Sequence, residues 1–257
     1  MGVVIGLLVL SLVFGLLEGR FSALPKRSIW RRERTVDFLY WFFTPFVTRA
    51  ISAIAAGATF LLLARVTGRS LGSSWFASQP LLLQWIEVLV GGDLTGYATH
   101  RLFHRRPLWR FHAIHHSSES LDWLAAARVH PLNEPISRVL QLIPFFLLGF
   151  DPRVVAAAVP FLTFYAIFLH ANVRWDFGPL RHVIASPRFH RWHHTSEDDG
   201  LDRNFAGLFP WIDVLFGTFH MPRDREPQRF GLHDEPIPTT FVAQLAYPFR
   251  RSISAIK

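Results

Sequence analysis

Histidines gather in one stretch of this sequence. Eleven of the 13 lie between residues 100 and 194, and none precedes residue 100. Residues three or four apart share one face of a helix, so histidines at this spacing can present two or three imidazoles to one point. Three clusters have it: His100 and His104; His112, His115 and His116; and His190, His193 and His194.

The chemistry that these clusters favour is metal binding. Neutral imidazole is a good ligand for iron, copper, zinc and nickel and is less suited to magnesium or calcium. Eight imidazoles are too many for one ion, so we expect two ions in one site, with His130 and His170 completing the ligand set. A lone histidine pair is more often a packed or surface pair, but His-x-x-His-His occurs twice here. The absence of cysteine excludes thiolate and iron–sulfur ligation.

Carboxylates precede the first cluster. Asp93, Tyr97, His100 and His104 are spaced by four, three and four, so they line one helix face. Asp93 is predicted to accept a hydrogen bond from the free N–H of a ligand imidazole and orient it; the alternative is a polar contact between spans. Glu87 lies off this face and receives no role.

Long apolar stretches are predicted to carry the histidines. Half of the residues are hydrophobic and the mean hydropathy is +0.23, which points to membrane spans. The stretches are 2–17, 37–64, one beginning near Pro80, and the pair 136–149 and 152–171. Residues 2–17 could be a signal peptide, but no basic residue precedes them, so a retained span is favoured. The sequence predicts an all-α, multi-pass integral membrane bundle with a cytoplasmic histidine-rich di-metal cap.

Charge predicts the orientation of this bundle. Residues 18–36 hold six of the basic side chains and are expected in the cytoplasm, with the N-terminus outside. The histidine clusters and the C-terminus then also lie on the cytoplasmic side. The net charge of +8 is interspersed with Leu and Phe, which indicates a membrane surface and no nucleic acid.

The rest of the chain is predicted to be a cap and a tail. His182 is off the cluster periodicity and is expected to be structural, whereas His220 and His233 lie in a proline-rich loop and are expected to be solvated. We divide the chain into N-terminal transmembrane segments with a basic loop (1–84), a catalytic domain (85–220) and a cytoplasmic tail (221–257).

The order of these motifs resembles the fatty acid hydroxylase / sterol desaturase superfamily over roughly residues 85–220. The resemblance rests on the three clusters, on His130-Pro131, on His170 after an apolar hairpin, and on Asn204-Phe-Ala-Gly207 followed by Trp211 to Thr218. Some relatives place a second histidine four residues before the one matching His170. Here that position is Ala166, so His130 is expected in the missing place.

The resemblance implies a membrane enzyme with two iron ions that uses O2 to hydroxylate or desaturate a lipid C–H bond. The implied ligands are the eight clustered histidines, His130 and His170, with Asp93, Tyr97 and Asn204 as candidates beside them. No flavin, haem or ferredoxin module is recognisable, so electrons must come from an external donor.

Two other interpretations stay open at this point. A zinc-dependent membrane hydrolase could also use imidazoles, but catalytic zinc typically takes roughly three protein ligands. A metal transporter would place its ligands within the spans, near the membrane midplane, whereas here they lie at segment ends. The sequence does not identify the lipid (sterol, fatty acyl, carotenoid or ether lipid), the reaction outcome, or the oligomeric state.

Overall fold

The computed structural model of the protein describes residues 1–24, 31, 33–68, 74–232 and 237–250. These residues form helices and contain no strand, only the isolated bridges Ser22–Val173 and Thr195–Phe230. The expected all-α class is therefore confirmed. The helices are α1 (Gly2–Phe21), α2 (Arg34–Phe43), α3 (Arg49–Thr67), α4 (Leu81–Phe103), α5 (Trp109–His116), α6 (Asn133–Leu148), α7 (Pro152–His170), α8 (Pro187–His193), α9 (Trp211–Leu215) and α10 (Phe241–Ala246).

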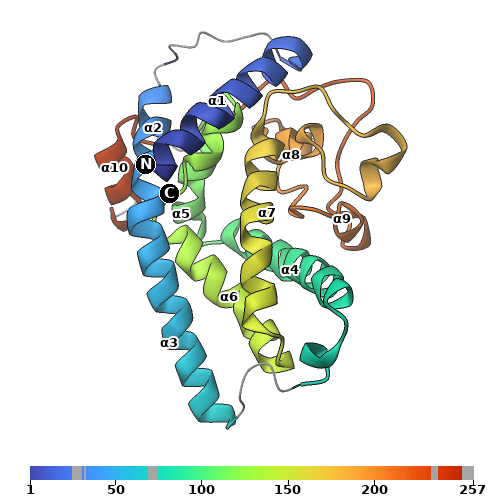
Figure 1. Cartoon of the computed structure of the whole chain (residues 1–257). Coiled ribbons are helices and arrows are strands. Elements are labelled where there is room, and N and C mark those ends of the chain that lie inside the picture. Colours follow the sequence, from blue (N-terminus) through green and yellow to red (C-terminus); the bar gives the residue numbers. More distant parts are fainter. Residues whose placement is uncertain (25–30, 32, 69–73, 233–236, 251–257) are drawn as a thin grey trace.

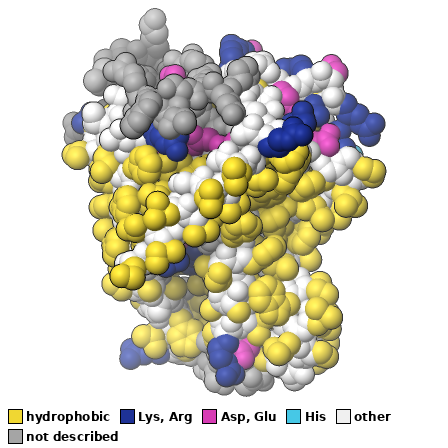
Figure 2. Space-filling model, turned by 45° about the horizontal axis from the view of Figure 1, so that its top comes forward, with side chains coloured by type: hydrophobic (Ala, Val, Ile, Leu, Met, Phe, Trp, Pro, Cys, Tyr) yellow, Lys and Arg dark blue, Asp and Glu magenta, His cyan; other side chains and the backbone are white. Residues whose placement is uncertain are grey.

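Three helical segments are long and apolar enough to cross a membrane. They are α1, the continuous run from Arg34 to Thr67 that contains α2 and α3, and α7. Figure 1 shows α3 beside α6 in the lower left of the molecule, with α4 packed against both α6 and α7 and α8 near the upper end of α7. Exposed apolar side chains cover much of the face in Figure 2, as expected for a surface that meets lipid.

The apolar pair 136–149 and 152–171 forms a helical hairpin, α6 and α7. Gly149 ends α6 in the left-handed conformation with φ 76°, which glycine adopts without steric cost. The Asp151 side chain then accepts the backbone N–H of Arg153 and caps α7. The turn is short, so α7 runs back toward the histidines and delivers His170 at its last position.

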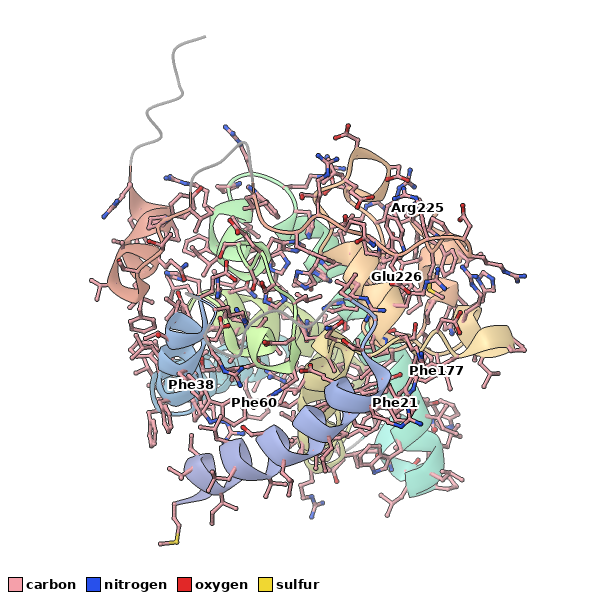
Figure 3. The ribbon with its side chains drawn as sticks, turned by 90° about the horizontal axis from the view of Figure 1, so that it is seen from above. Phe21, Phe38, Phe60, Phe177, Arg225 and Glu226 are labelled. Carbon is pink, nitrogen blue, oxygen red and sulfur yellow. The ribbon has the colours of Figure 1, made fainter. Side chains whose placement is uncertain are left out.

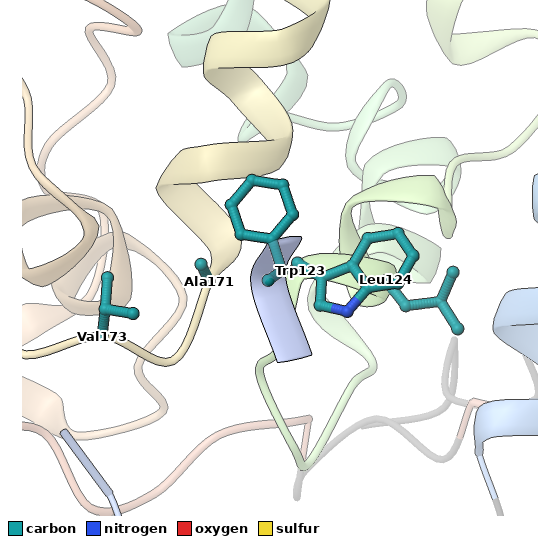
Figure 4. Close-up of a cluster of buried hydrophobic side chains, with 5 residues drawn as sticks. Trp123, Leu124, Ala171 and Val173 are labelled. Carbon is teal, nitrogen blue, oxygen red and sulfur yellow. The ribbon is translucent and has the colours of Figure 1, made fainter. Parts of the chain in front are cut away.

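Helix α1 packs onto the histidine end of the bundle. Phe14 is buried against Trp123, which lies in the 3-10 helix Trp123–Ala127, and the two rings stack with centroids 5.9 Å apart. Figure 4 shows this cluster, which also holds Leu124, Ala171 and Val173. The Glu18 carboxylate accepts backbone N–H groups of Trp123 and Asn172. The end of α1 is thereby fixed beside the end of α7.

A buried ion cluster ties α2 to the segment before His130. Asp37 Oδ1 lies 2.7 Å from Arg128 Nε, and Asp37 Oδ2 lies 2.7 Å from Arg31 Nη2. Arg31 also pairs with Asp122 at 2.8 Å. Part of the basic 18–36 segment thus has an internal structural role in addition to its predicted one in membrane orientation.

Candidate metal centre

Nine histidines converge at the upper end of the bundle. Helix α4 ends in His100 and His104, α5 ends in the second cluster, α7 ends in His170, and α8 ends in the third cluster. Their ligand atoms form two groups, each with all atoms within 4.8 Å of one another. The metal 1 group is His100, His104, His112, His116 and His193; the metal 2 group is His115, His170, His190 and His194.

The two His-x-x-His-His motifs divide between the groups in a crossed pattern. His112 and His116 enter the metal 1 group, whereas His115 of the same helix enters the metal 2 group. The third cluster does the reverse: its i, i+4 pair enters the metal 2 group and His193 enters the metal 1 group. Neighbouring positions on a helix point in different directions, so each motif serves both groups and holds them beside each other.

The imidazoles share one orientation, with Nε2 inward. Six of the nine have an acceptor for the outer Nδ1: a backbone carbonyl for His100, His115, His170 and His193, Asn133 Oδ1 for His112, and Asp202 Oδ1 for His104. Such contacts fix the proton on Nδ1 and leave the Nε2 lone pair for a metal.

The inner nitrogens fit a bound cation. Five pairs of Nε2 atoms face each other at 3.0–3.2 Å. In two of these pairs, His100–His112 and His115–His170, an acceptor holds the Nδ1 proton of both rings, so two lone pairs oppose each other. The Nε2 atoms of His104 and His193 are buried without any hydrogen-bond partner. Cations between these nitrogens would remove the repulsion and satisfy the orphaned atoms. An all-imidazole donor set suits iron, copper, zinc or nickel.

Burial keeps these rings neutral. It lowers the pKa of His100 to about 3 and holds the pKa of His112, His115 and His193 well below its ordinary value. Neighbouring imidazoles lower these pKa values further, because a second positive charge in the cluster is disfavoured. A neutral imidazole is the form that binds a metal, so the site is held ready for a metal at neutral pH.

The lowered pKa values predict how stability depends on pH once metal has been removed. In the unfolded chain the imidazoles titrate near pH ~6.5, whereas in the fold burial lowers the pKa of rings such as His100. Below about pH 6.5 the unfolded state therefore binds more protons, and stability falls with acidification. Thermal unfolding midpoints of chelator-treated protein should drop between pH ~7 and ~5. A flat or rising midpoint would contradict this account of the site.

Asp202 is a functional candidate that was missed from the sequence. Its carboxylate accepts a 2.9 Å hydrogen bond from His104 Nδ1, and this bond lowers the pKa of the Asp202 carboxyl. The residue has φ 55°, in the left-handed region that aspartate tolerates better than most residues. Asp202 lies 98 residues from His104 in the sequence, so helical spacing could not predict that the two side chains are paired.

Replacing Asp202 by alanine should loosen the metal 1 group. Carboxylates that orient a ligand imidazole typically contribute about 10–100-fold to metal affinity, so we expect a loss in that range. Asp202→Asn keeps an acceptor oxygen and should lose less. Competition with a chromophoric chelator measures both, with Asp224→Ala, an exposed change in the segment expected to be the tail, as control. Equal affinity of Asp202→Ala and the unchanged protein would remove Asp202 from the site.

Asp93 acts on a loop and does not contact an imidazole directly. Its carboxylate accepts three backbone N–H groups, from Gly207, Leu208 and Phe209, at 2.7–3.0 Å. Among the residues that the structure describes, no hydrogen bond joins it to a histidine. The hydrogen bond that we expected from a histidine N–H to Asp93 is absent from the described part of the chain, because these three backbone N–H groups occupy the carboxylate oxygens. The same loop supplies the Phe205 carbonyl to His100, so Asp93 positions that ligand through the loop.

The other two candidates also hold this loop. Asn204 has φ 58°, and its side chain binds backbone groups of Phe189 and His220. Tyr97 places its hydroxyl 3.0 Å from Thr218 Oγ1 and does not reach the inner nitrogens. Phe205, between them in the fold, covers the metal 1 group, with ring centroids 4.9–5.7 Å from three ligand histidines, His100, His104 and His193.

The remaining four histidines lie outside both groups or outside the described residues. His130 directs Nε2 to the Leu245 carbonyl and Nδ1 to the Leu132 N–H, so both nitrogens are engaged elsewhere. We therefore leave it out of the ligand set. His182 is exposed and packs on Phe219, whereas His220 is half-buried against Trp192. His233 lies outside the described residues.

A segment of the expected tail is bound to α8. Arg188 donates to the carbonyls of Pro222, Arg223 and Arg225, and buried Arg191 pairs with Glu226 at 3.1 Å. These arginines lie beside His190 and His193, so residues 222–226 hold the helix that carries them. No periodic pattern in residues 222–226 predicts this contact.

Comparisons with known proteins agree with this arrangement. The fatty acid hydroxylase family model matches residues 85–218. Ornithine lipid hydroxylase of Rhizobium tropici is 35% identical over 178 residues, which are 69% of this chain and 54% of that protein. Alkylglycerol monooxygenase of Danio rerio is 32% identical over 55% of this chain and 31% of its own length. Methylsterol monooxygenase 1 of Rattus norvegicus is 27% identical over 49% and 43%.

The matched part of this chain therefore spans about half or less of these relatives' lengths. No solved structure matches the chain.

Proposed function

Because the chain belongs to the fatty acid hydroxylase family, we propose that it is a membrane-bound lipid monooxygenase or desaturase with a pair of non-haem iron ions. The observation that carries the proposal is the pair of buried imidazole groups, of five and four nitrogens, beside the end of a candidate membrane span. The proposed ligands are the eight clustered histidines and His170. Ornithine lipids, alkylglycerols and methylsterols are the substrates named for the relatives, so a membrane lipid is the proposed substrate class.

Iron bound there would supply O2 activation, which an unactivated C–H bond requires because it has no acidic proton. The protein's own residues would bind the iron ions, orient the imidazole rings and shield one side of the site. The outer hydrogen bonds of His100, His104 and His112 hold their rings in one tautomer. Phe205 covers one side of the metal 1 group. Since α7 runs from the apolar part of the bundle to His170, an apolar substrate can approach from the membrane.

An external electron donor belongs to the same proposal, since O2 activation by reduced iron consumes electrons. The alternatives fit the geometry less well. Nine histidines exceed the ligand number of a catalytic zinc ion. The imidazoles lie at the ends of α4, α5, α7 and α8, whereas a transporter binds its ion near the membrane midplane.

Isotopically labelled O2 tests the activity. A host that makes diverse membrane lipids would express the chain or its His193→Ala variant, and its lipid extract would be compared by mass spectrometry. A lipid that gains one labelled oxygen atom only with the unchanged chain indicates hydroxylation, and one that loses two hydrogens indicates desaturation. Identical lipid profiles across several such hosts, from protein shown to hold iron, would reject the proposed function.

The proposed sidedness is tested separately. We expect residues 18–36 and the histidine groups in the cytoplasm, because basic residues concentrate in that segment. Topology-reporter fusions at residue 30 and after residue 218 should both report a cytoplasmic location. A periplasmic or luminal signal at either point would overturn this orientation without affecting the metal site. The division of the chain at residues 84 and 220 remains part of the proposal.

A further inference from the structure

A surface pocket lies apart from the histidine groups, where the segment between α7 and α8 meets the 222–226 segment. Its volume is about 550 Å³, and it is lined by Asp176, Gly178, Pro179, Arg181 and Arg223. None of the nine grouped histidines lines it. Gly178 and Arg181 belong to a 3-10 helix, Gly178–His182, which forms one wall. The proposed oxygenase chemistry gives this pocket no role.

Arg181 is the central side chain of the pocket. Its exposed fraction is 6%, its guanidinium lies over the Phe219 ring, and one Nη donates to the Met221 carbonyl. The Nε atom is buried without a hydrogen-bond partner. Because the guanidinium keeps little contact with water, an anion in the pocket would stabilise its charge.

The charged groups around Arg181 do not supply this anion. Arg223 also lines the pocket, and the positive charges of Arg223 and Arg188 disfavour the charged form of Arg181. The carboxylates of this region, Asp176 and Glu226, are both paired with Arg188, and Glu226 also pairs with Arg191. The pocket itself is lined by two arginines and one carboxylate, and that carboxylate, Asp176, is already paired with Arg188, which leaves a surplus of positive charge in the pocket. Such a pocket favours an anion.

The surroundings indicate which anion. Leu180, Val183 and Ile184 are 52%, 48% and 38% exposed on the same segment. Trp175 packs on Phe21 at the end of α1, and Phe177 stacks on Phe168 near the end of α7. Figure 3 shows Phe21 and Phe177 near each other, on the same side of the molecule. Aromatic and apolar side chains beside the ends of candidate spans, next to arginines, are typical of the membrane interface.

We propose that this pocket binds the phosphate of a membrane phospholipid headgroup, with Arg181 and Arg223 as its ligands and Leu180, Val183 and Ile184 in contact with the acyl region. Asp176 is placed to accept a hydrogen bond from a headgroup hydroxyl. Arginine suits this role because its planar fork matches phosphate oxygens. The site would hold the cap against the lipid surface, independently of which lipid is oxidised.

Native mass spectrometry of the full-length protein in detergent tests the proposal. Equal amounts of phosphatidylglycerol and of diacylglycerol with the same acyl chains would compete. The unchanged protein should retain phosphatidylglycerol preferentially. Loss of one charge-assisted hydrogen bond is worth about tenfold in affinity, so Arg223→Gln and Arg181→Gln should each lower retention by about that factor. Arg229→Gln, an exposed change on the neighbouring segment that does not touch the pocket, should keep it.

Metal content and circular dichroism serve as folding checks. If Arg181→Gln does not fold, Arg223→Gln alone decides, because Arg223 is exposed. Equal retention of the two lipids by the unchanged protein would overturn the proposal, as would retention that Arg223→Gln leaves unchanged. A second titration with inorganic phosphate separates the sources: release of the lipid at millimolar phosphate would show a site for soluble phosphate and would also overturn it. A negative result here leaves the oxygenase proposal untouched.

Discussion

Replacing His193 by alanine should remove the activity and at least one of the two proposed metal ions. His193 Nε2 lies in the metal 1 group, and its Nδ1 is held at 2.8 Å by the Arg203 carbonyl, so the fold orients this ring toward the group. Loss of a partner that only orients a ligand typically costs about 10–100-fold, and we expect loss of a ligand itself to exceed about 100-fold in turnover. Metal analysis and O2 consumption on the same detergent-extracted sample measure both effects.

The crossed arrangement sharpens this test. His115→Ala removes a ligand from the metal 2 group, although His115 lies in the motif that gives two ligands to the metal 1 group. The two variants should therefore each lose activity and should differ spectroscopically in which ion is retained. His182→Ala, an exposed histidine outside both groups, is the matched control. Full metal content and activity in His193→Ala would refute the ligand assignment.

Most of the convergence of the histidines could be predicted from the sequence because their spacing is local. A helix places residues i and i+4 on one face, and the pairs His100–His104, His112–His116 and His190–His194 each enter one group. The division of the histidines into two groups could not be predicted, since it depends on how α5 and α8 face each other. His130 was expected to complete the ligand set, but the fold turns its ring toward Leu245, more than a hundred residues away in the chain.

The contacts that support the ligands were less predictable, because most join residues far apart in the sequence. Asp93 shares a helix face with His100, and the sequence predicted a direct contact. The carboxylate binds instead the backbone of residues 207–209, which lie between α8 and α9 in the chain. Asp202 and Arg128 carry no periodic signal at all. Sequence periodicity locates a side chain on its own element, and only the packing of elements determines its partner.

Asp37→Ala should be among the most destabilising single changes in the chain. Asp37 is 0% exposed and Arg128 is 2% exposed, and their 2.7 Å bond joins α2 to the segment before His130. Removing one member of a buried ion pair leaves the other charge uncompensated and typically costs about 3–5 kcal/mol. A fall of the free energy of unfolding in that range, measured in detergent by denaturant titration or as a lower unfolding midpoint, is the expected result.

The same change should weaken the metal 2 group. The Arg128 carbonyl accepts the Nδ1 proton of His115 at 3.1 Å, so a displaced Arg128 loosens that ligand. Arg138→Ala is the matched control, because it breaks the partly exposed Glu134–Arg138 pair on α6, where a loss of about 0.5 kcal/mol or less is expected. If Asp37→Ala costs no more than Arg138→Ala and keeps its full metal content, Asp37 neither stabilises the fold nor positions His115. If Asp37→Ala costs several-fold more than Arg138→Ala and also loses metal, helix α2 supports the metal site through the Asp37–Arg128 pair. Helix α2 lies outside residues 85–218, the segment that matches the family model.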